Sequence, residues 1–201
     1  GGPKDRPELL YERARLLRGF SDRPGALEVL DELFAVEPEH AGALALAAEV
    51  HVSLEQWEEA VACLRRLARA GIPEGQRRVA HLGAADFLET HLDARDAALA
   101  ELRAVEALGL ADLDTWMRIG ALEESFENPS AAIDAYQRIV ERAPDHGAAV
   151  DRLAELLDGE EREALLRRHE DAIWPEIDAG ELDEKRLERL RTAAHWRGQL
   201  E

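Results

Sequence analysis

Cysteine is almost absent from this chain of 201 residues, which contains only Cys63. A single cysteine excludes an intrachain disulfide and any zinc site that needs several thiolates. Long apolar runs are missing as well: none approaches the roughly 20 residues of a membrane-spanning helix, and the first residues contain no apolar segment typical of a signal peptide. We therefore expect a cytoplasmic protein with no membrane partner. Residues 1–6 are expected to be a cloning scar, a linker or a cut within a longer protein.

Positive charge is scarce. The chain has 25 lysines and arginines against 43 aspartates and glutamates, a formal net charge of −18. We expect no nucleic-acid partner, because a phosphate backbone would be repelled. Nearly all the basic residues are arginine, since Lys4 and Lys185 are the only lysines. A GC-rich bacterial genome and halophilic adaptation both account for such a composition.

Helix-forming residues dominate what is present, and 46% of the chain is hydrophobic, which is too much for a disordered protein. Small and large residues recur in pairs four positions apart. The pairs are Ala26 and Leu30, Ala60 and Leu64, Ala98 and Leu102, and Ala132 and Tyr136. The four alanines are 34, 38 and 34 residues apart. Since a small residue lets a neighbouring helix approach closely and a large one fills the space between helix pairs, this period predicts stacked helical repeats.

The clearest unit contains Trp116, Ile119-Gly120 and Glu123, followed by Ala132, Tyr136 and Pro144. This spacing resembles the tetratricopeptide repeat, which has an aromatic residue where this chain has Glu123. The resemblance covers about residues 7–158. It implies an all-α fold, a right-handed α-solenoid of about five helix pairs with a C-terminal capping helix. The pairs are expected near residues 7–40, 41–73, 74–111, 112–145 and 146–173.

Residues 159–201 depart from the pattern and are expected to form an atypical last helix and the capping helix. We expect the atypical helix to end at Trp174-Pro175. Ser53-Leu54-Glu55-Gln56 resembles a capping box at a helix start. The expected helices are 8–19, 24–36, 41–53, 56–70, 75–91, 94–108, 113–126, 130–142, 146–158, 160–173 and 181–198.

No motif points to catalysis, a cofactor or a metal. His81 and His91 are ten residues apart, which is not the spacing that places two ligands on one helical face. Cys63 lies on a packing helix and is expected to be an inert, partly buried thiol. Carboxylate pairs such as Glu58-Glu59 are typical of a solvated helical surface. We therefore expect no enzymatic activity, no cofactor and no metal.

The resemblance implies that the first helix of each pair lines a concave groove that binds peptides. By position, the groove should be basic at its N-terminal end, apolar in the middle and acidic at its C-terminal end. The expected groove residues are Tyr11, Arg15, Arg18, Glu49, Val52, Arg77, Phe87, Met117, Glu124, Asp151 and Glu155. The chaperone-binding subclass grips a peptide carboxylate with lysines and asparagines. The only asparagine here, Asn128, lies in an expected turn, so that clamp is absent.

Two functions fit these features. The first is a non-enzymatic adaptor, part of a larger protein, that binds a peptide or partner protein in the groove. The second is a structural scaffold or oligomerisation element that uses the terminal helices. We expect a monomer or a weak homo-oligomer; a stable monomer would support the first function, and a dimer lost on removal of residues 181–201 the second.

Overall fold

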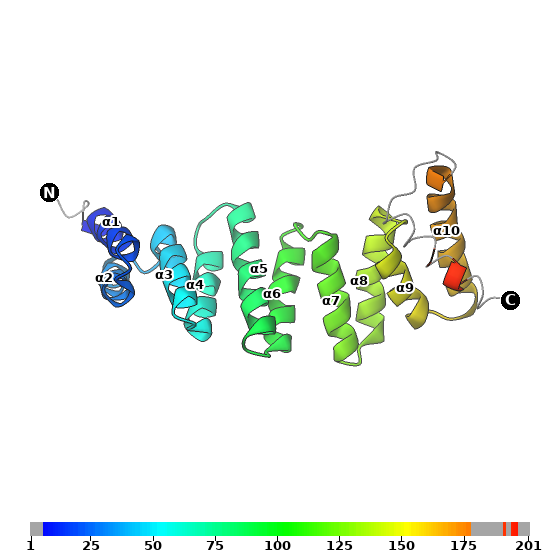
Figure 1. Cartoon of the computed structure of the whole chain (residues 1–201), viewed down its shortest axis with the longest axis horizontal. Helices are drawn as coiled ribbons and strands as arrows, with labels where there is room; N and C mark the ends of the chain where they lie inside the picture. Colours follow the sequence, from blue (N-terminus) through cyan, green and yellow to red (C-terminus); the bar gives the residue numbers. More distant parts are fainter. Residues whose placement is uncertain (1–5, 178–190, 192–193, 197–201) are drawn as a thin grey trace. The chain divides into compact units, whose positions relative to one another are not determined.

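The structure is a computed structural model and describes residues 6–177, 191 and 194–196. In that part of the chain the regular structure is entirely helical (Figure 1). The helices are α1 (Arg6–Gly19), α2 (Arg23–Val36), α3 (Ala41–Ser53), α4 (Trp57–Arg69), α5 (Glu74–Thr90), α6 (Arg95–Ala107), α7 (Leu113–Ser125), α8 (Pro129–Arg142), α9 (Gly147–Leu156) and α10 (Gly159–Ile177). They belong to two compact units, one ending at Leu110 and the other beginning at Ala111.

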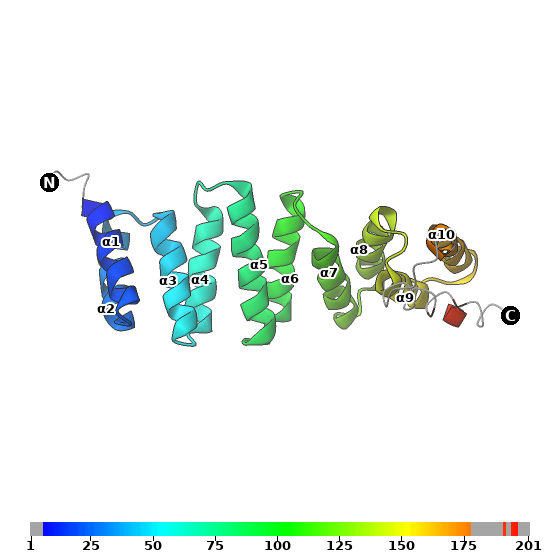
Figure 2. The ribbon, with the colours of Figure 1, turned by 45° about the horizontal axis from the view of Figure 1, so that its top comes forward.

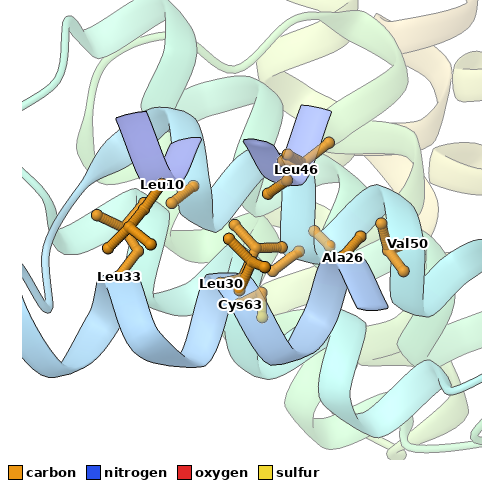
Figure 3. Packing of buried hydrophobic residues seen from close by; sticks show 12 residues of the cluster. Leu10, Ala26, Leu30, Leu33, Leu46, Val50 and Cys63 are labelled. Carbon is orange, nitrogen blue, oxygen red and sulfur yellow. The ribbon is translucent and has the colours of Figure 1, made fainter. Parts of the chain in front are cut away.

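The first unit is a row of three helical hairpins. Helix α1 packs on α2, α3 on α4 and α5 on α6, while α2 also contacts α3 and α4 contacts α5 (Figures 1 and 2). Figure 3 shows the core between the first two hairpins, where Leu30 and Leu33 of α2 meet Leu10 of α1 and Leu46 of α3. Cys63 of α4 is buried beside them, and this burial raises the pKa of its thiol.

Each hairpin turn contains one residue with a left-handed backbone. These residues are Ser21 (φ 64°), Glu55 (φ 57°), Asp93 (φ 47°) and Glu127 (φ 57°). Each lies five positions before one of the recurrent alanines, so the turns repeat with the same 34, 38 and 34 spacing. All four alanines are fully buried. The sequence period and the backbone period are therefore the same repeat.

The second unit begins with the hairpin of α7 and α8. A Cβ atom on Gly120 of α7 would lie 2.4 Å from the ring of Tyr136 on α8, so glycine is what allows the buried ring to lie against the helix backbone. Helix α9 packs on α8, and α10 packs on α9. His169 of α10 is fully buried, with Nδ1 2.7 Å from the backbone oxygen of Pro144.

Several helix starts use caps that the sequence analysis did not assign. Nδ1 of His40 accepts a hydrogen bond from the backbone N–H of Ala43 at 3.1 Å, and His146 does the same for Ala149 at 3.2 Å. The expected capping box at Ser53 is wrong. The Ser53 hydroxyl donates to the carbonyl oxygen of Val50 at the end of α3, because its own backbone still belongs to that helix.

The expected end of the atypical helix at Trp174-Pro175 is also wrong, since α10 continues to Ile177. A proline in the last turn removes one backbone donor but leaves few later bonds to break, so the helix can extend two residues further. The expected helix 181–198 lies mostly outside the described residues. Within it, residues 191 and 194–196 are helical.

Candidate functional site

An open groove of about 680 Å³ runs between α3 and α5 in the first unit. Its lining residues are Ala41, Gly42, Ala45, Ala48, Glu49 and Val52 of α3, Leu64 and Leu67 of α4, and Gly75, Gln76, Val79, Ala80, Gly83 and Phe87 of α5. Twelve of these fourteen residues lack a polar side chain. The volume lies within the range of about 300–1,000 Å³ that is typical of ligand sites.

Small residues create the groove. Gly42, Ala45 and Ala48 are three apart on α3, so they occupy one helical face, and Ala80 and Gly83 occupy a matching face of α5. Their short side chains leave space between the two helices. Leu64 and Leu67 of α4 contribute apolar surface to the same space. The groove can therefore accept apolar side chains from another segment.

Helix α1 adds charge beside the α3 wall. The ring of Tyr11 lies against Gly42, where a Cβ atom would be 2.9 Å from Cζ of the tyrosine. The guanidinium of Arg15 lies 5.8 Å from the centre of that ring and is also paired with Glu12. Arg18 forms an ion pair with Glu49, one of the groove residues. The two arginines expected at the basic end thus lie beside this wall, and each already has an acidic partner.

Aromatic residues gather at Phe87. The ring of Trp57 lies 5.5 Å from the ring of Phe87 and stacks on His91 at 3.7 Å with an interplanar angle of 3°. Trp57 begins α4 and His91 follows α5, so the stack ties the start of one helix to the end of the next. The contact between Trp57 and Phe87 holds the Phe87 ring in place in the groove wall.

The expected groove residues separate into four groups. Glu49, Val52 and Phe87 line the groove, and Tyr11, Arg15 and Arg18 lie beside its α3 wall. Arg77 does not line it, because its Nε donates to the carbonyl oxygen of Ala68 at 3.1 Å. The other four, Met117, Glu124, Asp151 and Glu155, belong to the second unit.

The acidic residues of the second unit are already engaged. Glu124 accepts hydrogen bonds from the Tyr136 hydroxyl at 2.6 Å and from Nε of Arg152 at 3.1 Å. Arg152 also pairs with Glu155 at 2.7 Å, so it joins two of the expected residues. Burial, and then the hydrogen bond to Glu124, raise the pKa of Tyr136 far above its usual value. Asp151 accepts a hydrogen bond from Trp196.

Sequence reasoning missed part of the groove and one buried polar cluster. The sequence predicts only a packing role for Leu64, and it singles out neither Leu67 nor Val79, although Val79 is 66% exposed. The cluster centres on Glu101 of α6, which accepts from Nε of Arg65 at 2.6 Å and pairs with Nδ1 of His81 at 2.7 Å. No local sequence signal joins residues 36 and 20 positions apart.

Two findings concern other site types. Across residues 6–177, 191 and 194–196, no three histidine, cysteine, aspartate or glutamate residues come together in a way that could hold a metal ion. In the same residues, none of the helices is both long and apolar enough to span a membrane.

Comparisons with known proteins agree with this architecture. A sequence model described as tetratricopeptide repeat matches residues 17–71. No curated protein matches the chain. Among solved structures, YrrB, a TPR protein with an unusual peptide-binding site, is 20% identical, with 85% of this chain and 88% of that chain covered and a TM-score of 0.55.

MamA is also similar in structure. One MamA structure is 16% identical over 90% of this chain and 98% of its own, with a TM-score of 0.57. MamA from Desulfovibrio magneticus RS-1 is 17% identical over 88% and 98%, with a TM-score of 0.51. At these identities the similarity establishes the shared fold. The chain therefore has the helical-repeat fold of these proteins, and its residues 17–71 match the tetratricopeptide repeat.

Proposed function

We propose that this chain is a non-enzymatic adaptor whose α3/α5 groove binds an apolar peptide segment of a partner protein. The observation that carries the proposal is the groove itself: about 680 Å³, open to solvent and lined almost entirely by apolar residues. Exposed apolar surface rimmed by polar residues is typical of interaction sites. Tetratricopeptide repeats are typically non-enzymatic interaction modules, and YrrB, which shares the fold, has a peptide-binding site.

The groove also favours a particular kind of segment. Its walls offer no free charge at the centre, so apolar side chains of the ligand should supply most of the affinity. Arg15 and Arg18 beside the α3 wall favour an acidic flank on the ligand that replaces Glu12 and Glu49 as their partners, and this flank would set orientation and association rate. We propose that Met117, Glu124, Asp151 and Glu155 contact a partner from the second unit, as a surface distinct from the α3/α5 groove.

The test is a screen of a peptide array of apolar-centred segments with acidic flanks, followed by titration of the selected peptides with the full chain. Phe87→Ala should weaken binding by about tenfold at all salt concentrations, because it removes apolar contact area. Ala45→Leu should also weaken it by filling the groove. Arg15→Glu should matter most at low salt, where charges are least screened.

Phe20→Ala is the matched control, since Phe20 is an aromatic residue that is 81% exposed and outside the groove lining. It should leave the affinity unchanged. Circular dichroism must show that each variant melts like the parent. Peptides whose affinity ignores both Phe87→Ala and Ala45→Leu would show that the groove is not the binding site.

A second candidate function is a scaffold that assembles through α1. Leu9 and Leu16 lie seven positions apart on one face of α1, and Phe20 directly follows the helix; the three are 66%, 61% and 81% exposed. Covering such a face would stabilise an oligomer. Light scattering over a concentration series tests it: a parent dimer that is lost in Leu16→Glu supports assembly, and a parent that stays monomeric opposes it.

A further inference from the structure

Trp196 is a buried side chain among exposed neighbours. It is 6% exposed, whereas Arg191, Ala194 and His195 all lie exposed to solvent. Only one residue of this described stretch is thus taken out of water. A buried aromatic residue that follows exposed residues is typical of an anchor in a binding site.

The contacts of Trp196 are specific for an indole. Its Nε1–H donates a hydrogen bond to Oδ1 of Asp151 on α9 at 2.8 Å. The guanidinium carbon of Arg162 on α10 lies 5.6 Å from the ring centre. A carboxylate forms a charge-assisted hydrogen bond with the indole N–H. A cation over the ring interacts more strongly with tryptophan than with other aromatic residues. Phenylalanine would lose the first contact and weaken the second.

The guanidinium of Arg162 is held in position by the connection between α9 and α10. Nε of Arg162 donates to the carbonyl oxygen of Leu157 at 2.8 Å, and its Nη2 lies 3.4 Å from Oδ1 of Asp158. These bonds do not involve Trp196. The arginine is therefore placed by the fold of α9 and α10, and it would remain there if the indole left.

We propose that Asp151 and Arg162 form a tryptophan-binding site, that Trp196 of the same chain is its resident ligand, and that a tryptophan-bearing segment of a partner binds by displacing Trp196. This site lies within the second unit, and the inference stands independently of the α3/α5 groove. An intramolecular ligand acts at an effective concentration of the order of millimolar. The resident tryptophan therefore raises the concentration of partner that is needed to occupy the site.

The test uses the chain's own segment as the probe. A fluorescently labelled peptide with the sequence of residues 191–201 is titrated into the full parent chain and into Trp196→Ala. The vacated site should bind the peptide at least tenfold more tightly than the parent. Adding Asp151→Ala should abolish this gain, and a peptide carrying phenylalanine in place of tryptophan should bind at least fivefold more weakly.

Asp134→Ala, which removes an exposed carboxylate of α8, is the matched control and should leave binding to the Trp196→Ala chain unchanged. Equal binding to the parent and to Trp196→Ala would overturn the proposal. So would binding that ignores Asp151→Ala, or no saturable binding to Trp196→Ala up to about 1 mM. Because the groove variants Phe87→Ala and Ala45→Leu lie in the first unit, failure of one site is distinguishable from failure of the other.

A second measurement serves if Trp196→Ala does not fold. The chain has four tryptophans, so its nitrogen–proton spectrum contains four indole signals, and Trp196→Phe identifies the one of interest. In the parent that N–H should exchange with water slowly, and in Asp151→Ala at least tenfold faster. An N–H that exchanges in the parent as fast as an exposed indole would overturn the proposal.

Discussion

Tyr136 combines packing and polar functions in one residue. Its ring is fully buried against Gly120, and its hydroxyl donates to Glu124, which also accepts from Arg152. The buried hydroxyl is therefore satisfied by a charged partner, an arrangement that is stabilising only while the hydroxyl keeps its proton. This hydrogen bond explains how a tyrosine, with its polar hydroxyl, can occupy a fully buried position here.

This residue should make stability depend on alkaline pH. Burial, followed by the hydrogen bond to Glu124, raises the pKa of Tyr136 above its ordinary value of 10. Above that pH the unfolded chain loses the proton while the folded chain keeps it. The free energy of unfolding should therefore fall as pH rises past 10, by up to about 1.4 kcal/mol per pH unit.

Chemical denaturation followed by circular dichroism, between about pH 9 and about pH 11.5, measures this decline. In Tyr136→Phe the free energy of unfolding should fall less steeply with pH, by the contribution of one proton. Groups that titrate equally in both chains cancel in the comparison. Equal slopes in the parent and in Tyr136→Phe would contradict the prediction.

At the scale of the element, the hairpin turns depend on one left-handed residue each. Glu127 has φ 57° between α7 and α8, where a β-branched residue is disfavoured and glycine is not. Glu127→Val should lower the free energy of unfolding by about 1–2 kcal/mol, and Glu127→Gly should leave it nearly unchanged. Thermal melting of the two variants checks this, and equal losses would be inconsistent with a backbone origin.

Three helices of the first unit are tied together by the carboxylate of Glu101. It lies on α6, 7% exposed, and holds Arg65 of α4 and His81 of α5. Glu101→Gln removes the charge but keeps the shape, so it should lower the free energy of unfolding by about 1–2 kcal/mol. This is the lower part of the range for hydrogen bonds to charged groups, because the Arg65 side chain is 35% exposed. Denaturant unfolding measures the loss. Glu58→Gln, at an exposed position, should change stability by less than about 0.5 kcal/mol.

For the whole molecule, stability should be distributed by unit. Gly120→Ala forces a methyl group against the ring of Tyr136 and should cost about 1–3 kcal/mol. Since repeats are coupled mainly to their neighbours, amide exchange should accelerate in α7–α9 and stay unchanged in α1–α4. Exchange followed by mass spectrometry tests this. Gly75→Ala is the control, because its methyl group would meet no atom within 4 Å, and uniform acceleration along the chain would contradict the prediction.

The repeat architecture could be predicted from the sequence because its causes are local. Helix periodicity and the small–large pairs act over a few residues, so the alanines at 34, 38 and 34 spacing indicate the hairpins and their order. The same local signals indicate the buried face of α8, where Ala132 and Tyr136 are both fully buried. They did not predict the end of α10 correctly, because a proline at position 175 indicated a helix end before Ile177.

Contacts between distant residues were decided only by the tertiary structure. Arg18 meets Glu49, Arg65 meets Glu101 and Trp196 meets Asp151 across 31, 36 and 45 positions. Arg77, expected in the groove, instead caps a carbonyl oxygen nine residues away. The sequence by itself determined which faces are apolar, because burial follows from periodicity. Which charges find partners, and which small residues open into a groove, depends on how one helix packs against another, and no local pattern encodes that geometry.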